Sequence, residues 1–416
     1  MPLRPSLSIV VLLIAFSCLF GCSGGMTVSP PVDPTPAPAP AKAVPSYVPI
    51  SEEKAEILSE DLSFGSQGLE SWEAMKPGLE DSLGYILDRP ENAVCVRRPG
   101  LTLTWGQLGD SVAELLALLP RLEGEPELVG ERFQWLKVAP GTLLTGYYEP
   151  WLEASLTRQG PFQYPLYGVP DDLRVIDLGA FHRRWKGQSL VYRMGEKGIK
   201  PYHDREAIDG EGALDGEGSE IAWAKDPVDV FFLQIQGSGR LVLPDGRVKH
   251  ILYGGRNGRR YVSLGKVLIK KGYVPRDEMS MQRIRQFLDA NPEKARELMF
   301  RNPSYVFFRL SDKGPYGAMG SILTPRLSVA VDRNMIPLGG VCVLKTALQD
   351  SGRGDAEDFL SLVLAQDTGG AIQGTRMDLF CGSGEKAELL AGHLQEDSEV
   401  FLLVSRRVME PALNKG

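Results

Sequence analysis

The stretch Leu360-Ser-Leu-Val-Leu-Ala-Gln-Asp367-Thr-Gly-Gly-Ala-Ile-Gln-Gly-Thr-Arg-Met-Asp378-Leu-Phe380 carries the pattern on which the fold class depends. A short apolar run ends at an acidic residue, two glycines turn the chain, and the next apolar segment contains a second aspartate. Apolar runs of this length, bounded by glycine, are typical of buried strands. The stretch therefore predicts a buried strand that ends in a carboxylate, with another carboxylate in apolar surroundings beyond the turn.

Asp378 stands between Met377 and Leu379, with Phe380 next along the chain, which predicts partial desolvation and a raised pKa. A carboxyl group that stays protonated near neutral pH is what a general acid at a glycosidic oxygen requires. Asp367 would tune it by hydrogen bonding or by charge, separating the two pKa values. The alternative, a turn aspartate with a structural hydrogen bond, stays open on these residues alone. Asp332, before a Pro/Gly turn, is by itself more typical of a structural turn residue.

Outward from this stretch, the chain is mostly helical at first and rich in strands later. Helices are predicted over much of 51–120, including one from Thr104-Trp105 to Pro120, within 262–303, and at 385–394. Gly272, Ser280 and Asn291-Pro292 are the expected helix boundaries in the second region. Strands are predicted at 230–236, 239–243, 248–253, 305–308, 328–331, 341–344, 360–365 and 400–404. The fold class is therefore mainly β with flanking helices, in two domains, and the pattern leaves the topology open.

Composition excludes several classes of function. The chain has 416 residues, 43% hydrophobic and 24% charged, which suits a globular protein with two cores. A formal net charge of -7 argues against a nucleic-acid surface. The few histidines and cysteines lack zinc-ligand spacing, so no zinc site is expected. Cys95, Cys342 and Cys381 are expected to be buried thiols, although one disulfide among them stays possible on the sequence.

The N-terminus is predicted to be a targeting signal rather than a folded element. Residues 1–21 have the basic start and short apolar run of a signal peptide. They end at Leu19-Phe20-Gly21-Cys22, which resembles a bacterial lipobox with Cys22 as the lipidated residue. An ordinary signal peptide cut nearby is the alternative. Ser23 after that cysteine implies sorting to the outer membrane, and the proline-rich residues 22–50 predict an extended tether.

Two further segments are expected to bind sugars. Thr145-Gly-Tyr-Tyr-Glu-Pro150 places Tyr147 and Tyr148 on a predicted Gly/Pro-bounded loop, and aromatic faces suit sugar rings. Gln234-Ile-Gln-Gly-Ser-Gly-Arg240 places amides and a hydroxyl at the end of a predicted strand. The acidic run at 209–220 lacks the ligands of a calcium loop and predicts a solvated loop.

In these motifs the sequence resembles the membrane-bound lytic murein transglycosylase A family. The likeness runs from about residue 142 to 404 and is looser over 50–141. It is carried by Thr145–Pro150, by Asp226–Arg240, by Tyr253-Gly-Gly-Arg-Asn-Gly258, by Ser304–Arg309, by Gly317–Pro325, by Asp332–Gly339 and by Asp367 to Phe380.

The resemblance implies a fold and a set of site residues. A discontinuous domain, residues 51–150 and 311–416, would contain a double-psi β-barrel, and a β-rich domain, residues 151–310, would be inserted into it across a cleft. The catalytic acid maps onto Asp378, with Asp367 and Asp332 as supporting carboxylates. The sugar-binding segments map onto Tyr147, Tyr148, Glu149, Gln236, Ser238, Gly369 and Gly370.

The implied reaction cleaves the β-1,4 bond between N-acetylmuramic acid and N-acetylglucosamine in peptidoglycan and leaves a 1,6-anhydro ring. A single carboxylate would act first as acid and then as base, so this implied reaction requires neither a metal nor a cofactor. A peptidoglycan-binding lipoprotein without catalysis is the first alternative. The second is a polysaccharide hydrolase on a similar barrel with Asp367 or Asp332 as base. Exo or endo action, tolerance of peptide crosslinks, protein partners and oligomeric state stay open.

Overall fold

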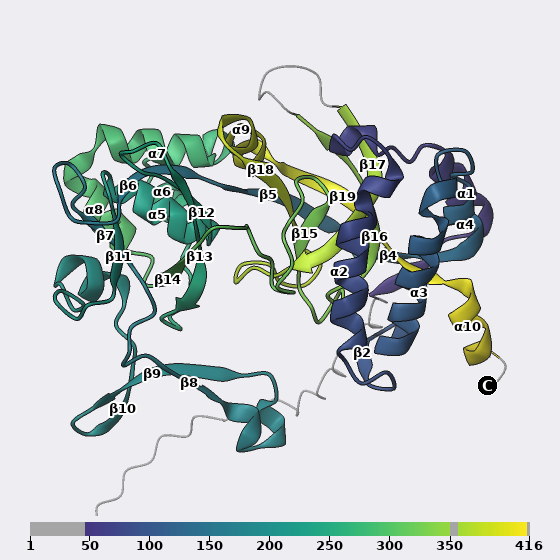
Figure 1. Cartoon of the computed structure of the whole chain (residues 1–416), viewed down its shortest axis with the longest axis horizontal. Coiled ribbons are helices and arrows are strands. Elements are labelled where there is room, and N and C mark those ends of the chain that lie inside the picture. The colour runs from purple at the N-terminus through teal and green to yellow at the C-terminus, as the bar shows by residue number, and fades with distance from the viewer. Residues whose placement is uncertain (1–45, 350–356, 414–416) are drawn as a thin grey trace, which may run out of the picture. The chain divides into compact units, whose positions relative to one another are not determined.

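The computed structural model describes residues 46–349 and 357–413, and Figure 1 shows that strands dominate this part of the chain. The predicted signal peptide 1–21, the lipidated Cys22 and nearly all of the tether 22–50 lie outside the described residues. No helix within the described ranges is long and apolar enough to cross a membrane. The predicted class, mainly β with flanking helices, is confirmed.

A closed barrel is built from β5 (Thr142–Glu149), β15 (Ser328–Val331), β16 (Val341–Leu348), β17 (Glu357–Asp367), β18 (Met377–Ser383) and β19 (Gln395–Ser405). Around the barrel the order is β5, β18, β15, β17, β16 and β19, and β19 pairs with β5 to close it. The length of β19 makes this possible, because residues 395–398 pair with β5 while residues 401–405 pair with β4 (Phe133–Val138). β1 (Tyr47–Pro49) extends the sheet beyond β4.

Helices from both ends of the chain cover the barrel. They are α1 (Glu52–Glu60), α2 (Lys76–Leu87), α3 (Trp105–Leu118), α4 (Leu128–Arg132), α9 (Glu385–His393) and α10 (Arg406–Leu413). α3 begins where predicted, because Thr104 and Gln107 form a reciprocal capping box. The region 51–120 is less helical than predicted, since β2 (Val94–Arg98) and β3 (Leu101–Thr104) form a hairpin. One hydrophobic core joins these helices to the barrel strands.

A second sheet comes from the residues between β5 and β15. Its order is β14 (Val306–Ser311), β13 (Val248–Arg256), β12 (Gly239–Val242), β6 (Trp151–Ser155), β11 (Glu220–Ala224) and β7 (Tyr164–Tyr167). It has its own apolar core, and a further core lies among α5 (Pro227–Gln236), α6 (Leu264–Lys270), α7 (Met281–Ala290) and α8 (Pro292–Phe300). The barrel and the second sheet therefore have separate hydrophobic cores.

The prediction of a strand at 230–236 is wrong, because these residues belong to α5. Asp226 caps the start of the helix by accepting a hydrogen bond from the backbone of Val228, and Pro227 is its first residue. Gly237 ends the helix with a φ of 84°. Two sides of α5 are apolar, because Val230 and Leu233 pack in the core of the second sheet while Phe231 and Phe232 pack in the core formed with α6, α7 and α8. An apolar run without periodicity does not distinguish a buried strand from a buried helix, and only the flanking caps do.

The segment 145–150 was predicted as a loop, but residues 142–149 form β5. Gly146 does not mark a turn there. A side chain at Gly146 would lie 2.8 Å from the Cα of Ala391, so glycine permits α9 to approach β5. The helix boundaries at Gly272, Ser280 and Asn291-Pro292 are confirmed.

The three remaining cysteines and the acidic run all lie within the described residues. Cys342 is a buried thiol and Cys95 a half-buried one, each outside any disulfide, and Cys381 is buried in the barrel core. The prediction of a solvated loop at 209–220 is only partly right: Asp209 and Gly210 end a short π-helix, Glu206–Gly210, turns follow, and Leu214 is buried in a small apolar core; Asp209 pairs with the buried Arg205.

Candidate active site

Asp378 lies near the start of β18, between β15 and β5 in the barrel wall. The parallel register places it opposite Thr145, whose hydroxyl donates a hydrogen bond of 2.6 Å to Oδ1 of Asp378. Burial raises the pKa of Asp378 to about 6. The Thr145 hydroxyl and the Arg376 guanidinium oppose this rise, and the Asp367 carboxylate adds to it. The raised pKa agrees with the expectation from its apolar neighbours.

Asp367 ends β17 and is held by three donors. The Tyr147 hydroxyl donates to Oδ2 at 2.9 Å, and the backbone N–H groups of Ala318 and Thr368 donate to Oδ1 at 2.9 and 2.8 Å. Burial raises the pKa of Asp367 to about 6, against the effect of these donors. Because both oxygens of Asp367 already accept hydrogen bonds from the protein, this carboxyl group is held in place and is less available than Asp378 to exchange a proton with a substrate.

Strand alternation in β5 assigns its side chains to two faces. Thr145 and Tyr147, two residues apart, reach Asp378 and Asp367. Gly146 faces α9, and Tyr148 is buried on that same side. Burial and the Asp367 carboxylate raise the pKa of Tyr147 well above its usual range, so it remains a hydrogen-bond donor at neutral pH.

Arg376 and Thr145 stand in the quoted motifs but were not predicted as site residues. One guanidinium nitrogen of Arg376, Nη2, donates to the Thr145 hydroxyl at 3.2 Å, so a chain of hydrogen bonds runs from Arg376 through Thr145 to Asp378. The Nε of Arg376 is buried and has no hydrogen-bond partner among the described residues. The sequence offered one weak signal: Arg376 stands two residues before Asp378 and directly precedes β18.

Asp332 holds the loop that carries Arg376 rather than contacting Asp378. Its Oδ1 accepts from the backbone and side-chain nitrogens of Asn334 at 2.9 and 3.0 Å. Its Oδ2 accepts from the backbone of Gly374 at 2.9 Å. The structure thus places Asp332 as the residue that ties the turn after β15 to the loop 368–376.

Glu149 is fully buried at the end of β5. Its two oxygens face Arg240 at 3.1 Å and His250 at 3.4 Å, on strands β12 and β13 of the second sheet. Burial raises the pKa of Glu149, and Arg240 and His250 oppose that rise. Its contacts are therefore internal, and they hold the chain where it leaves the barrel for the second sheet.

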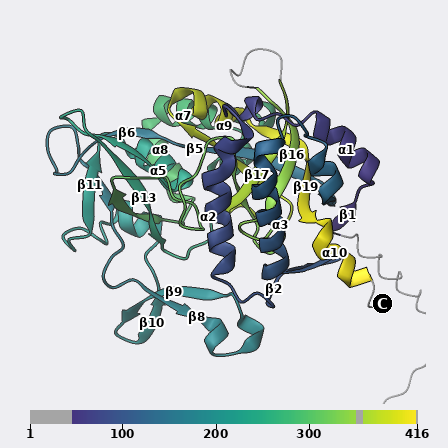
Figure 2. The same ribbon diagram turned by 45° about the vertical axis from the view of Figure 1, so that its right-hand side comes forward.

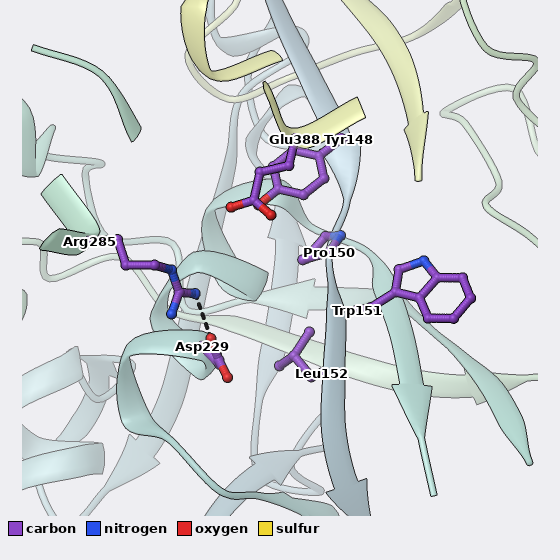
Figure 3. A pocket seen from close by; sticks show the side chains of 7 residues that line it. All are labelled: Tyr148, Pro150, Trp151, Leu152, Asp229, Arg285 and Glu388. Carbon is purple, nitrogen blue, oxygen red and sulfur yellow. Dashed lines mark hydrogen bonds and ion pairs between the residues drawn. The ribbon is translucent and has the colours of Figure 1, made fainter. Parts of the chain in front are cut away.

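Gln236 and Tyr148 meet at the same junction. The Gln236 side chain accepts a hydrogen bond of 3.1 Å from the backbone N–H of Tyr148, and Ser238 follows on the half-buried turn after α5. The Tyr148 ring lines a pocket of about 290 Å³ together with Pro150, Trp151, Leu152, Asp229, Arg285 and Glu388. Figure 3 shows Glu388 beside the Tyr148 ring and the ion pair between Asp229 and Arg285. The pocket lies behind β5, away from the face that carries Thr145 and Tyr147.

The loop after Asp367 is exposed and faces the second sheet. A side chain at Gly370 would lie 3.5 Å from Nη1 of Arg256, which belongs to β13. Arg256 and Tyr253 on β13 are both exposed. The 3.5 Å distance at Gly370 is an ordinary contact, whereas a side chain at Gly369 would lie 2.7 Å from Ile372, so it is Gly369 that permits the loop to fold on itself. The motif at 253–258 had been quoted for its resemblance, but its side chains were not predicted as site residues.

The arrangement supplies two desolvated carboxyl groups: Asp378, which accepts a hydrogen bond from one hydroxyl and feels the charge of a nearby guanidinium, and Asp367, which three donors hold in place. Such a group can give a proton to a leaving oxygen and take one back. Within residues 46–349 and 357–413, no cluster of three or more histidine, cysteine, aspartate or glutamate side chains is placed to hold a metal ion.

Comparison with known protein families gives two adjoining matches. Residues 143–309 match the MltA specific insert domain, and residues 327–404 match the 3D domain. The first covers β5 from its second residue onward and nearly all of the second sheet, and the second covers the remaining barrel strands with the three aspartates.

Similar proteins are found among both characterised sequences and solved structures. A membrane-bound lytic murein transglycosylase A from Vibrio cholerae is 34% identical over 265 residues, which are 63% of this chain and 65% of that protein, less than two thirds of its length. A crystal structure of a membrane-bound lytic murein transglycosylase from Agrobacterium tumefaciens superposes with a TM-score of 0.72 at 32% identity, covering 88% of this chain and 99% of that one. A structure of Escherichia coli MltA with bound chitohexaose has a TM-score of 0.62 at 28% identity, covering 80% and 90% of the two chains.

Proposed function

The chain belongs to the membrane-bound lytic murein transglycosylase A family, and from that premise we propose that it cleaves peptidoglycan glycan strands without water. The bond cut is the β-1,4 linkage between N-acetylmuramic acid and N-acetylglucosamine. The new end is 1,6-anhydro-N-acetylmuramic acid. The observation that carries the proposal is the difference between two desolvated carboxyl groups: Asp367 accepts three hydrogen bonds from the protein, whereas Asp378 accepts one, from Thr145.

Asp378 acts twice in this reaction. In its protonated form it donates to the glycosidic oxygen, and the bond from that oxygen to C1 of the muramic acid residue breaks with oxocarbenium-like character. The resulting carboxylate takes the proton of the C6 hydroxyl of the same sugar, whose oxygen bonds to C1. The carboxyl group ends protonated, as it began, so no water, metal or cofactor enters the balance.

The neighbours of Asp378 suit both protonation states. Burial keeps the pKa at about 6, so a useful fraction of the group is protonated near neutral pH. When the proton has left, the Thr145 hydroxyl and the Arg376 guanidinium stabilise the carboxylate until it accepts the proton from C6. We propose Asp367 and Asp332 as supporting carboxylates, the first by fixing Tyr147 and the second by fixing the loop 368–376.

The substrate surface is proposed from the residues around this carboxyl group. The sugar-binding cleft would be lined by Tyr147, Ser238, Gly369 and Gly370. The other three residues, Tyr148, Glu149 and Gln236, would act indirectly, because their contacts hold the junction between β5 and the second sheet. The chitohexaose bound to the Escherichia coli protein supports a site that accepts β-1,4-linked N-acetylated sugars.

The proposed organisation follows the same family. Residues 51–150 and 311–416 would form a discontinuous domain around a double-psi barrel, and residues 151–310 the inserted domain. Separate cores for the barrel and the second sheet support this division. Lipidation at Cys22 would anchor the chain to the outer membrane from the periplasmic side. The Vibrio cholerae relative is described as membrane-bound, which supports membrane association.

The test is digestion of purified peptidoglycan with mass spectrometry of the released muropeptides. Anhydro products are expected, and reducing-end products, heavier by one water, would identify a hydrolase instead. Asp378→Asn is expected to abolish release while glycan binding survives, because the amide neither donates nor accepts the required proton. Near-normal release by Asp378→Asn would remove Asp378 from its proposed role, and absence of release by the wild-type protein would leave a binding protein.

A further inference from the structure

Residues 171–201, here called the arm, form a three-stranded sheet separate from the two larger ones. Its strands are β8 (Arg174–Asp177), β9 (Ser189–Gly195) and β10 (Gly198–Pro201), which pair only with one another. Figures 1 and 2 both show the arm projecting from the second sheet, with no helix covering it. It takes no part in the site around Asp378.

The arm has one apolar face that the protein leaves uncovered. The register places Ile199 opposite Met194 and Ile176 opposite Leu190, and alternation puts all four side chains on the same face. Leu190, Met194 and Ile199 are 51%, 64% and 63% exposed. The opposite face carries Val191, which packs against the body of the protein near Gly258, and its register partner Val175, which is 62% exposed. The uncovered face is therefore turned away from the body.

Basic and aromatic side chains surround this face. The connection between β8 and β9 contains Phe181-His-Arg-Arg-Trp-Lys186, in which Phe181 is 65% exposed and both arginines and the lysine are exposed. Residues 181–200 contain six lysine and arginine residues and one acidic residue, whereas the whole chain has a formal net charge of -7. The arm is thus a cationic, apolar projection on an otherwise acidic protein.

We propose that the arm binds the surface of an anionic phospholipid membrane. The apolar face with Phe181 would enter the boundary between headgroups and acyl chains, and the basic side chains would lie at the phosphates. Exposed aromatic and aliphatic groups bordered by lysine and arginine are the chemistry that membrane interfaces select. The acidic remainder of the protein would be repelled by the same surface, which gives the contact a preferred orientation.

The chemistry of the arm favours a membrane over the two other candidate surfaces. Glycan strands present hydroxyl and amide groups, so they offer little to bury Leu190, Met194 and Ile199. A protein partner could cover the aliphatic face, but nothing in the chain specifies one. The lipid at Cys22, which belongs to the proposed function, would keep the arm within reach of a bilayer. One lipid anchor combined with a basic patch holds a protein more firmly than either signal alone.

The test uses the full chain carrying Cys22→Ser, so that no lipid is attached, and vesicles of phosphatidylcholine with or without phosphatidylglycerol. Cosedimentation with the anionic vesicles is expected, and it should weaken as salt shortens the range of the charges. Each lysine or arginine near an anionic surface contributes about fivefold to the binding constant. Arg183→Gln, Arg184→Gln and Lys186→Gln together should lower binding about 100-fold.

The apolar contribution is tested separately with Met194→Thr and Ile199→Thr, which keep strand-forming residues in place. In the proposed contact these two aliphatic side chains would be partly buried in the membrane, so their loss should lower vesicle binding by about tenfold. The matched control is Ile57→Thr with Leu87→Thr, whose side chains are 57% and 71% exposed and lie outside the arm. This control should bind vesicles as well as the unaltered arm does.

The charge control is Lys266→Gln, Lys313→Gln and Lys386→Gln, three exposed lysines outside the arm. Equal loss in this control, or wild-type vesicle binding by the arm variants, would overturn the proposal. So would arm variants that lose binding to peptidoglycan sacculi, or that change oligomeric mass, while vesicle binding persists. The readout is independent of Asp378, so failure of the catalytic proposal would leave the vesicle result unchanged.

Discussion

Replacing Thr145 with valine removes the hydroxyl that contacts the proposed acid–base while keeping the β-branched shape that suits β5. In the structure the Thr145 hydroxyl donates to Asp378 at 2.6 Å and accepts from Arg376 at 3.2 Å. The first contact has the short length of a hydrogen bond to an ionised oxygen. The change therefore removes stabilisation from the charged form of Asp378 and leaves the neutral form less affected.

The size of the effect follows from that hydrogen bond. A hydrogen bond to a charged group contributes about 1.5–3 kcal/mol. One pKa unit corresponds to about 1.4 kcal/mol, so the loss should raise the pKa of Asp378 by about 1–2 units. Starting from about 6, the carboxyl group of Thr145→Val would titrate between about 7 and 8.

The assay is the pH dependence of kcat/KM for release of anhydro-muropeptides. Cleavage needs the protonated acid, so the wild-type rate should fall as pH rises through the pKa of Asp378. In Thr145→Val this fall should move to higher pH by the same 1–2 units estimated above. The plateau rate should fall about tenfold or more, because the carboxylate formed after proton transfer is less stable.

Thr145→Ser is the matched control, since it keeps the hydroxyl and should keep the wild-type pH profile. Thermal melting followed by circular dichroism checks that both variants fold. A folded Thr145→Val variant with an unchanged pH profile would refute the assignment of Thr145 as the stabilising partner of Asp378.

Three further predictions follow from the same geometry. Arg376→Gln should also move the fall in rate to higher pH, by up to about one unit, and Arg376→Lys should restore the profile; a lower rate with an unmoved profile would indicate a purely structural role. Because the pKa of Asp378 is raised on folding from 3.8 to about 6, the folded state binds more protons between these values, and stability falls as pH rises through them. Asp378→Asn should therefore be more stable than wild type by about 1–3 kcal/mol at pH near 7.5, with the difference gone near pH 3.5, in urea titrations; a variant less stable at both pH values would contradict this. Cys22→Ser should release the protein from membranes after a high-salt wash, and retention under those conditions would count against lipidation.

Local signals predicted many element boundaries correctly because caps act over a few residues. The capping box at Thr104, the cap at Ser280 and the proline at position 292 each mark a helix start in the structure. The same logic would have identified α5 from Asp226 and Gly237, had the caps been given more weight than the apolar run between them. Capping is determined by neighbours in the chain, so it is readable without the fold.

The contacts that make the site could not be predicted in this way. Thr145 and Asp378 are 233 residues apart and meet only because β5 and β18 pair in one parallel register. A shift of one residue would turn Thr145 and Tyr147 to the opposite face of β5. That register depends on closure of the barrel by β19, whose two halves pair with different strands.

The sequence by itself determined that Asp378 lies in apolar surroundings and that Asp367 ends a strand, because both facts depend on adjacent residues. Only the tertiary structure decided which groups touch these carboxylates. It surrounded Asp367 with donors, gave Asp378 a hydroxyl and a cation, and buried Glu149 against Arg240. The physical reason is that hydrogen bonds between distant strands are set by register and closure, which no local pattern encodes.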